Sequence, residues 1–221
     1  MGRILSKDKP FLSQQHWNGQ QCCVIDVETT GLSVEYNEIV QVTILPLDGW
    51  LRPNIGIGRM PFDIYMMPNH PQNYDEEARK VTGIKLSFLE EHAYSQETGL
   101  GMLETWLDKL GLPLNKGGVN RCKILPLGQN YGFDRSFLQA WMGPTYYDEW
   151  FHYHYKDTMI TAEYLNDRAA MHGEQIPFPK TNLQYLASQL GIESRNAHDS
   201  MSDCITTAAV YRKMCLRGAI G

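Results

Sequence analysis

The stretch "CCVIDVETTG" (residues 22–31) places two carboxylates in a segment whose other residues predict a buried β-strand. Asp26 and Glu28 are two positions apart, so on a strand their side chains share one face, with Cα atoms roughly 6.5 Å apart. No lysine or arginine lies within ten residues before Asp26 or within twenty after Glu28. Ionised carboxylates in an apolar setting are costly without a cation, and a divalent metal such as Mg²⁺ or Mn²⁺ suits hard oxygen ligands. The alternative is that the strand ends at Val27, and that "TTG" forms a turn in which Glu28 is solvated.

Composition limits the classes of protein that remain. The chain has 221 residues, of which 43% are hydrophobic, which fits one domain with a sizeable core. A net charge of -5 argues against a wide basic surface that coats duplex DNA, but it allows an enzyme that grips a few nucleotides beside metal ions. No apolar run approaches the roughly 20 residues of a membrane span, and the N-terminus lacks a secretory signal. We therefore expect a soluble, cytoplasmic protein with no membrane partner.

The hydrophobic pattern predicts three early strands followed by alternating helices and strands, with no internal repeat. This order predicts an α/β fold, a mixed sheet of about five strands flanked by helices. The expected strands span residues 21–28, 37–49, 61–68, 123–130 and 151–158. The expected helices span residues 75–83, 99–111, 134–143, 159–171, 182–191 and 200–218.

Two further acids follow at the starts of predicted helices. Asp134 in "NYGFD" comes directly after an apolar strand, where an acid can also be no more than a first-turn residue that complements the helix dipole. Asp203 is the only acid from position 200 onward, and it lies on an apolar helical stripe, where it needs a partner. His198, about one turn earlier, could reach the same cavity and accept a proton at neutral pH, while Asp199 would cap the helix.

The three segments "DVETTGL", "NYGFD" and "HDSMSD" resemble, in the right order, the three motifs of the DEDDh family of 3'–5' exonucleases. This family includes ribonuclease T, oligoribonuclease and the proofreading subunit of bacterial replicative DNA polymerase. The segments "KVTGI", "KDTM" and "NLQYLASQLGI" also resemble parts of these enzymes. The resemblance runs from about Cys22 to Met214 and implies a ribonuclease-H-like fold.

The resemblance also implies a two-metal hydrolysis of the terminal phosphodiester, with the Mg²⁺ or Mn²⁺ ions roughly 3.5 to 4 Å apart. Asp26 would bridge both ions, Glu28 and Asp203 would complete the first, and Asp134 would hold the second. His198 would be the general base. The implied contacts to the terminal nucleotide are Val27, Thr29, Leu32 and Asn130.

The domain and substrate predictions follow from the same resemblance. We expect an N-terminal extension at 1–20 and an exonuclease domain at 21–217. The expected substrate is a single-stranded DNA or RNA 3' end or a short oligonucleotide, from which nucleoside monophosphates are released. Two alternatives remain open: a nuclease of very short or cyclic oligonucleotides, and a non-catalytic nucleic-acid-binding module with the same fold. The presence of all four acids and the histidine argues against the module.

The aromatic segment "YYDEWFHYHY" (residues 146–155) suggests a protein contact. Read as a loop followed by a strand, it places Phe151, Tyr153 and Tyr155 in the core. Tyr146, Tyr147 and Trp150 would then line a surface for a second subunit or a polymerase-like partner. We interpret His152 and His154 as polar residues on a sheet face, not as a zinc site.

Overall fold

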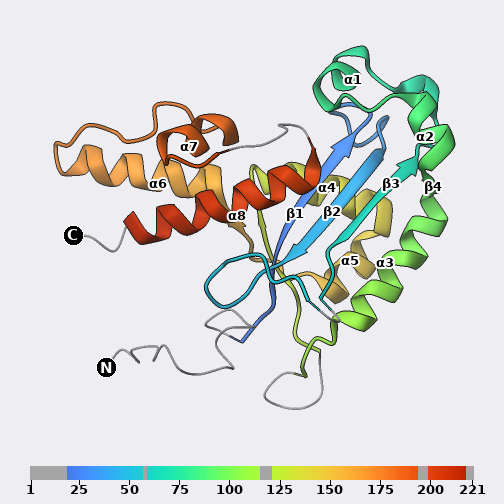
Figure 1. The fold of residues 1–221 in the computed structure, drawn as a ribbon, viewed down its shortest axis with the longest axis horizontal. Coiled ribbons are helices and arrows are strands. Elements are labelled where there is room, and N and C mark those ends of the chain that lie inside the picture. The colour runs from blue at the N-terminus through green and yellow to red at the C-terminus, as the bar shows by residue number, and fades with distance from the viewer. Residues whose placement is uncertain (1–18, 57–58, 115–120, 194–198, 218–221) are drawn as a thin grey trace.

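The computed structural model describes residues 19–56, 59–114, 121–193 and 199–217. Within these residues the strands form one six-stranded sheet in the order β4-β3-β2-β1-β5-β6 (Figure 1). The strands are β1 (Cys22–Thr29), β2 (Ile39–Pro46), β3 (Phe62–Met67), β4 (Tyr94–Ser95), β5 (Leu125–Gly128) and β6 (Lys156–Asp157). The helices are α1 (Glu76–Thr82), α2 (Leu86–His92), α3 (Gln96–Leu110), α4 (Tyr131–Met142), α5 (Pro144–Trp150), α6 (Thr158–Met171), α7 (Leu183–Gln189) and α8 (Ser200–Arg217). No helix in the described part of the chain is long and apolar enough to cross a membrane.

The sheet is mixed, as predicted. β2 runs antiparallel to both β1 and β3. β5 and β6 run parallel to β1, and β4 runs parallel to β3. The strand at 21–28 is confirmed as the central β1, which is buried except for partial exposure at Asp26 and Glu28. The prediction of about five strands missed β4, a strand of two residues that pairs only with Met66 and Met67. So short a strand depends on its tertiary partner and leaves no hydrophobic period in the sequence.

Helices cover both faces of the sheet (Figure 1). On one face Cys22 and Val24 of β1 pack in a cluster with Cys204 and Ala208 of α8. On the other face a larger cluster joins the alternate residues of β1 to helices α3, α4 and α5. Because side chains alternate along a strand, Asp26 and Glu28 continue the face of Cys22 and Val24 and therefore lie on the α8 side.

Several predicted helix ends are confirmed. α1 ends at Gly83 and α3 ends at Gly111, both in the left-handed region with φ of 69° and 64°. Glycine adopts this conformation without steric cost, which explains why each helix stops there. Asp199 accepts a hydrogen bond from the Ser202 backbone N–H at 3.1 Å, so it caps α8 as expected.

The interpretation of the aromatic segment was wrong in two respects. Pro144–Trp150 forms α5, in which Tyr147 and Trp150 are buried and not at a surface, while Tyr153 is 66% exposed and not in the core. Only Lys156–Asp157 of the predicted strand at 151–158 is a strand. The rings of Tyr147 and Phe151 stack with centroids 4.8 Å apart, because residues four positions apart lie on the same side of a helix. The alternation of aromatic residues that predicted a strand was therefore coincidental. The buried location of Phe151 is confirmed, and Tyr155 packs partly buried against the same cluster.

The burial of Trp150 generates the first prediction. The Arg121 guanidinium lies over the indole ring, 4.2 Å from its centroid. Trp150→Ala should therefore lower the free energy of unfolding by about 3–5 kcal/mol, the usual cost of truncating a buried aromatic side chain. Tyr153→Ala, at an exposed neighbour, should change it by no more than about 0.5 kcal/mol. Urea denaturation measures both, and a Trp150→Ala protein of normal stability that loses self-association would restore the surface interpretation.

Candidate active site

β1 carries the first two acids of the site. Asp26 lies opposite Thr43 of β2, and Glu28 lies opposite Gln41, so these four side chains form two polar pairs on the α8 face. The parallel pairing of β1 with β5 covers Cys22 to Val24. The acids thus lie past the segment of β1 that pairs with β5, and there the side chain of Asp134 bonds to the Val27 backbone N–H instead.

Asp134 comes to the site from the first turn of α4. Its side chain is buried and its Oδ1 accepts a hydrogen bond from the Val27 backbone N–H at 2.9 Å. The residue at the N-cap position is Asn130, in the left-handed region with φ of 58°. Asp134 therefore does more than complement its own helix, because it links α4 to the strand that carries the other two acids.

Asp203 comes from the first turn of α8 and is also buried. The fully buried Ser200 donates from its hydroxyl to the Asp26 carbonyl oxygen at 3.1 Å, which fixes the start of α8 on β1. The four predicted acids are thus brought together from β1, α4 and α8. His198 lies outside the described residues.

Burial and mutual repulsion raise the pKa values of these acids. Burial, and then the charge of Asp203, raise the pKa of Asp26 to about 7. Burial, and then Asp26, raise the pKa of Glu28 to about 9. The pKa of Asp134 is raised well above its usual range, mainly by burial and then by Asp26, although the Val27 N–H lowers it. Each shift has the direction expected for negative charge that the protein does not neutralise.

The donor set fits a hard divalent cation by its chemistry. In the described part of the chain, no ion pair joins Asp26, Glu28 or Asp134 to a lysine, arginine or histidine. Carboxylate oxygens are the ligands that Mg²⁺ and Mn²⁺ prefer. The same described residues contain no group of three metal-ligating side chains already placed around one point. Metal binding would therefore require these carboxylates to turn toward a shared ion.

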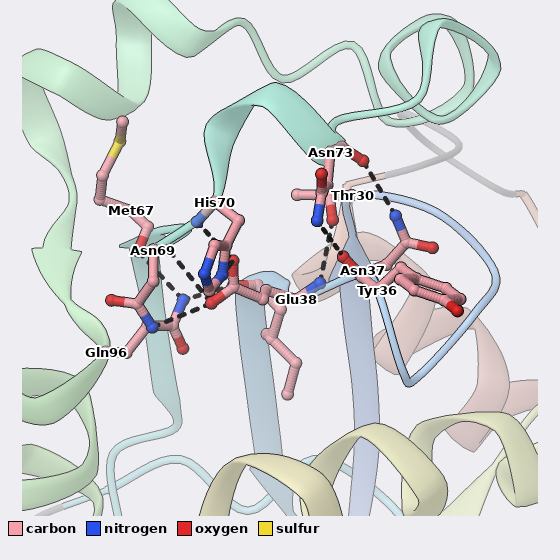
Figure 2. A network of polar contacts seen from close by, with 10 residues as sticks. Thr30, Tyr36, Asn37, Glu38, Met67, Asn69, His70, Asn73 and Gln96 are labelled. Atoms are coloured by element: carbon pink, nitrogen blue, oxygen red, sulfur yellow. Dashed lines mark hydrogen bonds and ion pairs between the residues drawn. The ribbon is translucent and has the colours of Figure 1, made fainter.

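The loop after β1 is held by a network of hydrogen bonds (Figure 2). The Thr30 N–H donates to the Glu38 carbonyl, and the Glu38 N–H donates to the Thr30 hydroxyl, both at 2.9 Å. Asn37 donates from Nδ2 to the Asn73 carbonyl, and the Glu38 carboxylate accepts from the backbone N–H groups of Asn69 and His70. The loop is thereby fixed to the segment that follows β3.

Gly31 allows this close approach. A Cβ atom there would lie 2.0 Å from Asp75 Oδ2 and 2.6 Å from Asn37 Nδ2. The Asn37 side chain is held in place by its bond to Asn73, so it has little freedom to move away. A side chain at position 31 would therefore disturb the loop beside the acids.

Two of the residues predicted to contact substrate line a cavity of about 440 Å³ beside this loop. Leu32 is 84% exposed, and Val81 is exposed on another wall. Thr29 and Leu32 thus share one cavity, and their contact with substrate stays a prediction. The backbone N–H groups of Val27 and Asn130 already donate to Asp134 and Asp157 respectively, so any substrate contact there would use other atoms.

The sequence analysis did not identify Asp157 as a supporting residue. Its buried carboxylate accepts from the backbone N–H of Tyr131 at 2.7 Å and from that of Met159 at 2.8 Å. It therefore fixes the start of α4, which carries Asp134, as well as the start of α6. The dipeptide Asp157-Thr158 before a helical pattern was an available capping signal.

Two acids on the central strand of a mixed sheet, completed by buried acids from helices on both faces, form an arrangement suited to metal-dependent phosphodiester hydrolysis. The comparisons agree with this class. The sequence model of the family described as "Exonuclease", of the ribonuclease T type, matches residues 23–120. An oligoribonuclease of Aliivibrio fischeri is 28% identical over 151 residues, which are 66% of this chain and 75% of the relative.

Solved structures of exonuclease I share the fold. The zinc-bound complex of E. coli exonuclease I with single-stranded DNA aligns with a TM-score of 0.69 and 22% identity over 92% of this chain. Exonuclease I from Methylocaldum szegediense aligns with a TM-score of 0.68 and 22% identity over 90% of this chain. The match covers 41% of each of those two chains, so this protein spans about two-fifths of their length. Over residues 23–120 the chain is thus similar in sequence to exonucleases of the ribonuclease T type, and it has the ribonuclease-H-like fold of exonuclease I.

The raised pKa values predict how the stability of the metal-free protein depends on pH. The folded-state pKa of Asp26 is about 7 against a usual value of 3.8, so the folded state binds protons more tightly than the unfolded state. This tighter proton binding contributes to the free energy of unfolding. The contribution is fully present below the usual pKa of 3.8 and is lost as the pH rises through the folded-state pKa of about 7. In excess EDTA, the melting temperature should therefore fall between about pH 5 and about pH 8.

Asp26→Asn supplies the matched comparison, because it removes the charge while keeping the shape of the side chain. It should flatten this decline, and Mg²⁺ should raise the melting temperature of the native protein more at about pH 8 than at about pH 5. Thermal unfolding followed by circular dichroism measures both effects. A melting temperature that rises with pH over this range in EDTA would contradict the electrostatic account.

Proposed function

We propose that this protein is a metal-dependent 3'–5' exonuclease that releases nucleoside monophosphates from single-stranded DNA or RNA. The observation that carries the proposal is the convergence of four acids from β1, α4 and α8, where the strand and α4 acids have no cationic partner among the described residues. A protein that only binds nucleic acid gains nothing from concentrated negative charge at the binding site. An enzyme that recruits divalent metals requires such charge.

Asp26, Glu28, Asp134 and Asp203 would hold two Mg²⁺ or Mn²⁺ ions. Such ions supply a nucleophile at neutral pH and stabilise charge on the attacking and leaving oxygens. Asp26 would be the ligand shared by both ions, and the mutual electrostatic effects of Asp26 with Asp203 and with Asp134 support this role. His198 would accept the proton of the attacking water, since imidazole titrates near neutral pH.

The cavity of about 440 Å³ would receive the terminal nucleotide. The exposed side chains of Leu32 and Val81 offer apolar contact to a base. Asp75, Glu76 and Glu77 on its wall disfavour a phosphate, so the base and sugar are the better occupants. The net charge of -5 gives little long-range hold on a polyanion, so we expect release after each cleavage at physiological salt.

A second candidate is a nuclease specialised for very short oligonucleotides. The similarity to an oligoribonuclease favours it, and the small size of the terminal cavity is compatible with it. The two candidates share the reaction and differ in how strongly the rate depends on substrate length.

Substrate polarity and metal dependence test the proposal. Wild-type protein with Mg²⁺ or Mn²⁺ should shorten 5'-labelled single strands stepwise from the 3' end, and a 3'-phosphate should slow this sharply. EDTA and Asp26→Asn should each abolish hydrolysis, because both remove the shared metal site. Gel electrophoresis of DNA and RNA series of several lengths measures polarity and length preference together. Comparable cleavage of a circular single strand, or full activity in EDTA, would contradict the proposal.

The proton-transfer role of His198 gives a separate prediction. His198→Ala should lower turnover by about 10² to 10⁴, the usual contribution of general base catalysis. Titration calorimetry should still detect metal binding by this variant, whereas Asp26→Asn should weaken it. Loss of metal binding in His198→Ala would instead make His198 a ligand.

A further inference from the structure

A second cavity, of about 350 Å³, lies on the far side of Thr82 from the one assigned to the terminal nucleotide. Thr82 lines both cavities, so the two are separated by the segment that leads from α1 to α2. The volume lies near the lower end of the range of about 300 to 1,000 Å³ that is typical of small-ligand pockets. The other lining residues are Gln41, Tyr65, Gly83, Ile84, Lys85, Phe88 and Asp199.

This second cavity adjoins the acids. Gln41 lies directly opposite Glu28 in the register of β1 and β2, which places their side chains on one face as neighbours. Asp199 on another wall caps α8, the helix that carries Asp203. The pKa of the Tyr65 phenol is raised mainly by burial and further by Asp63, Asp199 and Glu28, which is consistent with this proximity. A ligand held by the four acids can therefore extend into this cavity.

An aromatic wall forms one side of the second cavity. The rings of Tyr65 and Phe88 meet in a T-shaped contact with centroids 4.9 Å apart. Phe88 also stacks on His92 at 4.6 Å, which fixes its ring, yet its side chain remains 37% exposed. A rigid, partly exposed aromatic surface beside a nuclease site is suited to contact with a nucleobase.

Lys85 supplies positive charge at the rim of the same cavity. It is exposed and makes no ion pair in the described part of the chain, whereas nearby Lys80 pairs with Glu76 at 2.7 Å. Gln41 is buried and its Nε2 donates to Asp63, so its carboxamide has a fixed orientation. Among the residues that line the second cavity, Lys85 is the one that can attract a phosphate.

We propose that the second cavity binds the nucleotide on the 5' side of the scissile phosphate. Tyr65 and Phe88 contact its base, and Lys85 contacts the phosphate that joins it to the next nucleotide. This inference rests on the proposed exonuclease function, since it assigns the opposite side of the cleaved bond. Binding of the second base in this cavity makes the protein selective for strands in which that base can unstack from its neighbours and enter the cavity.

Substrates of increasing length separate the two cavities. The 4-nitrophenyl ester of a nucleoside 5'-monophosphate fills only the terminal cavity, a dinucleotide with a free 5' hydroxyl adds the second base, and a trinucleotide adds the next phosphate. Both a thymidine and a uridine series are measured. We compare kcat/KM for the dinucleotide with kcat/KM for the ester. Phe88→Ala removes the contact with the second base, so it should lower the ratio of these two values by about 5- to 150-fold. Most of this change should come from a higher KM for the dinucleotide. Phe88→Trp should preserve most of the ratio because it retains an aromatic surface.

Lys85→Gln tests the phosphate contact. It should lower kcat/KM for the trinucleotide relative to the dinucleotide, and it should reduce the slope of log kcat/KM against log salt for the trinucleotide by about 0.7. Lys85→Arg should restore both values. Lys109→Gln is the matched control, since Lys109 is also exposed but lines a different cavity between β3 and α3. It should leave these ratios unchanged.

The outcomes distinguish the two proposals. If wild-type protein hydrolyses none of the three substrates, the proposed exonuclease function fails. If it hydrolyses them but Phe88→Ala changes all three equally or none, the assignment of the second cavity is wrong while the exonuclease function stands. Equal effects of Lys85→Gln and Lys109→Gln on the trinucleotide would likewise overturn the assignment of the second cavity and leave the exonuclease function intact.

Discussion

Repulsion between buried carboxylates is the constraint on which this structure depends. Asp26 and Glu28 lie on the central strand β1, and Asp134 and Asp203 are brought toward them from α4 and α8. Burial and like charge both oppose ionisation of such a group. The apolar clusters on the two faces of the sheet must therefore hold in place an arrangement that is unfavourable by itself. Under the proposed function, metal binding would relieve this repulsion.

Other acids of the same region have the opposite role and show how the arrangement is held. Asp157 and Asp199 accept hydrogen bonds from backbone N–H groups at the starts of helices. Such bonds fix the start of a helix to its surroundings. The capping acids thereby position α4 and α8, which carry Asp134 and Asp203. One residue type thus serves two purposes: Asp157 and Asp199 hold the starts of helices, whereas Asp26 and Glu28 place carboxylates on the central strand.

The parts of the fold with strong local signals could be predicted from the sequence. The apolar run of β1 and the glycines after α1 and α3 determine structure within a few residues, and all were placed correctly. The segment at 151–158 was misjudged because alternating aromatics imitate a strand, while the Gly143-Pro144 signal for the start of α5 was overlooked. The docking of the loop at 30–38 could not be predicted, since it depends on hydrogen bonds to residues more than 30 positions away. The same holds for both cavities, whose walls come from separate elements.

Under the proposed function, the two cavities would also separate recognition from chemistry within the fold. The acids come from β1, α4 and α8, but much of the wall around both cavities comes from the segment between Asp75 and Phe88. Thr82 in that segment is held by the Tyr74 hydroxyl at 3.1 Å and by the Ile84 backbone N–H at 3.2 Å, so the wall shared by the cavities is fixed. Substitutions along this segment can alter which bases and phosphates fit without moving a single acid. Under the proposed function, preference for length or sugar would therefore depend on the segment between Asp75 and Phe88 and not on the four acids.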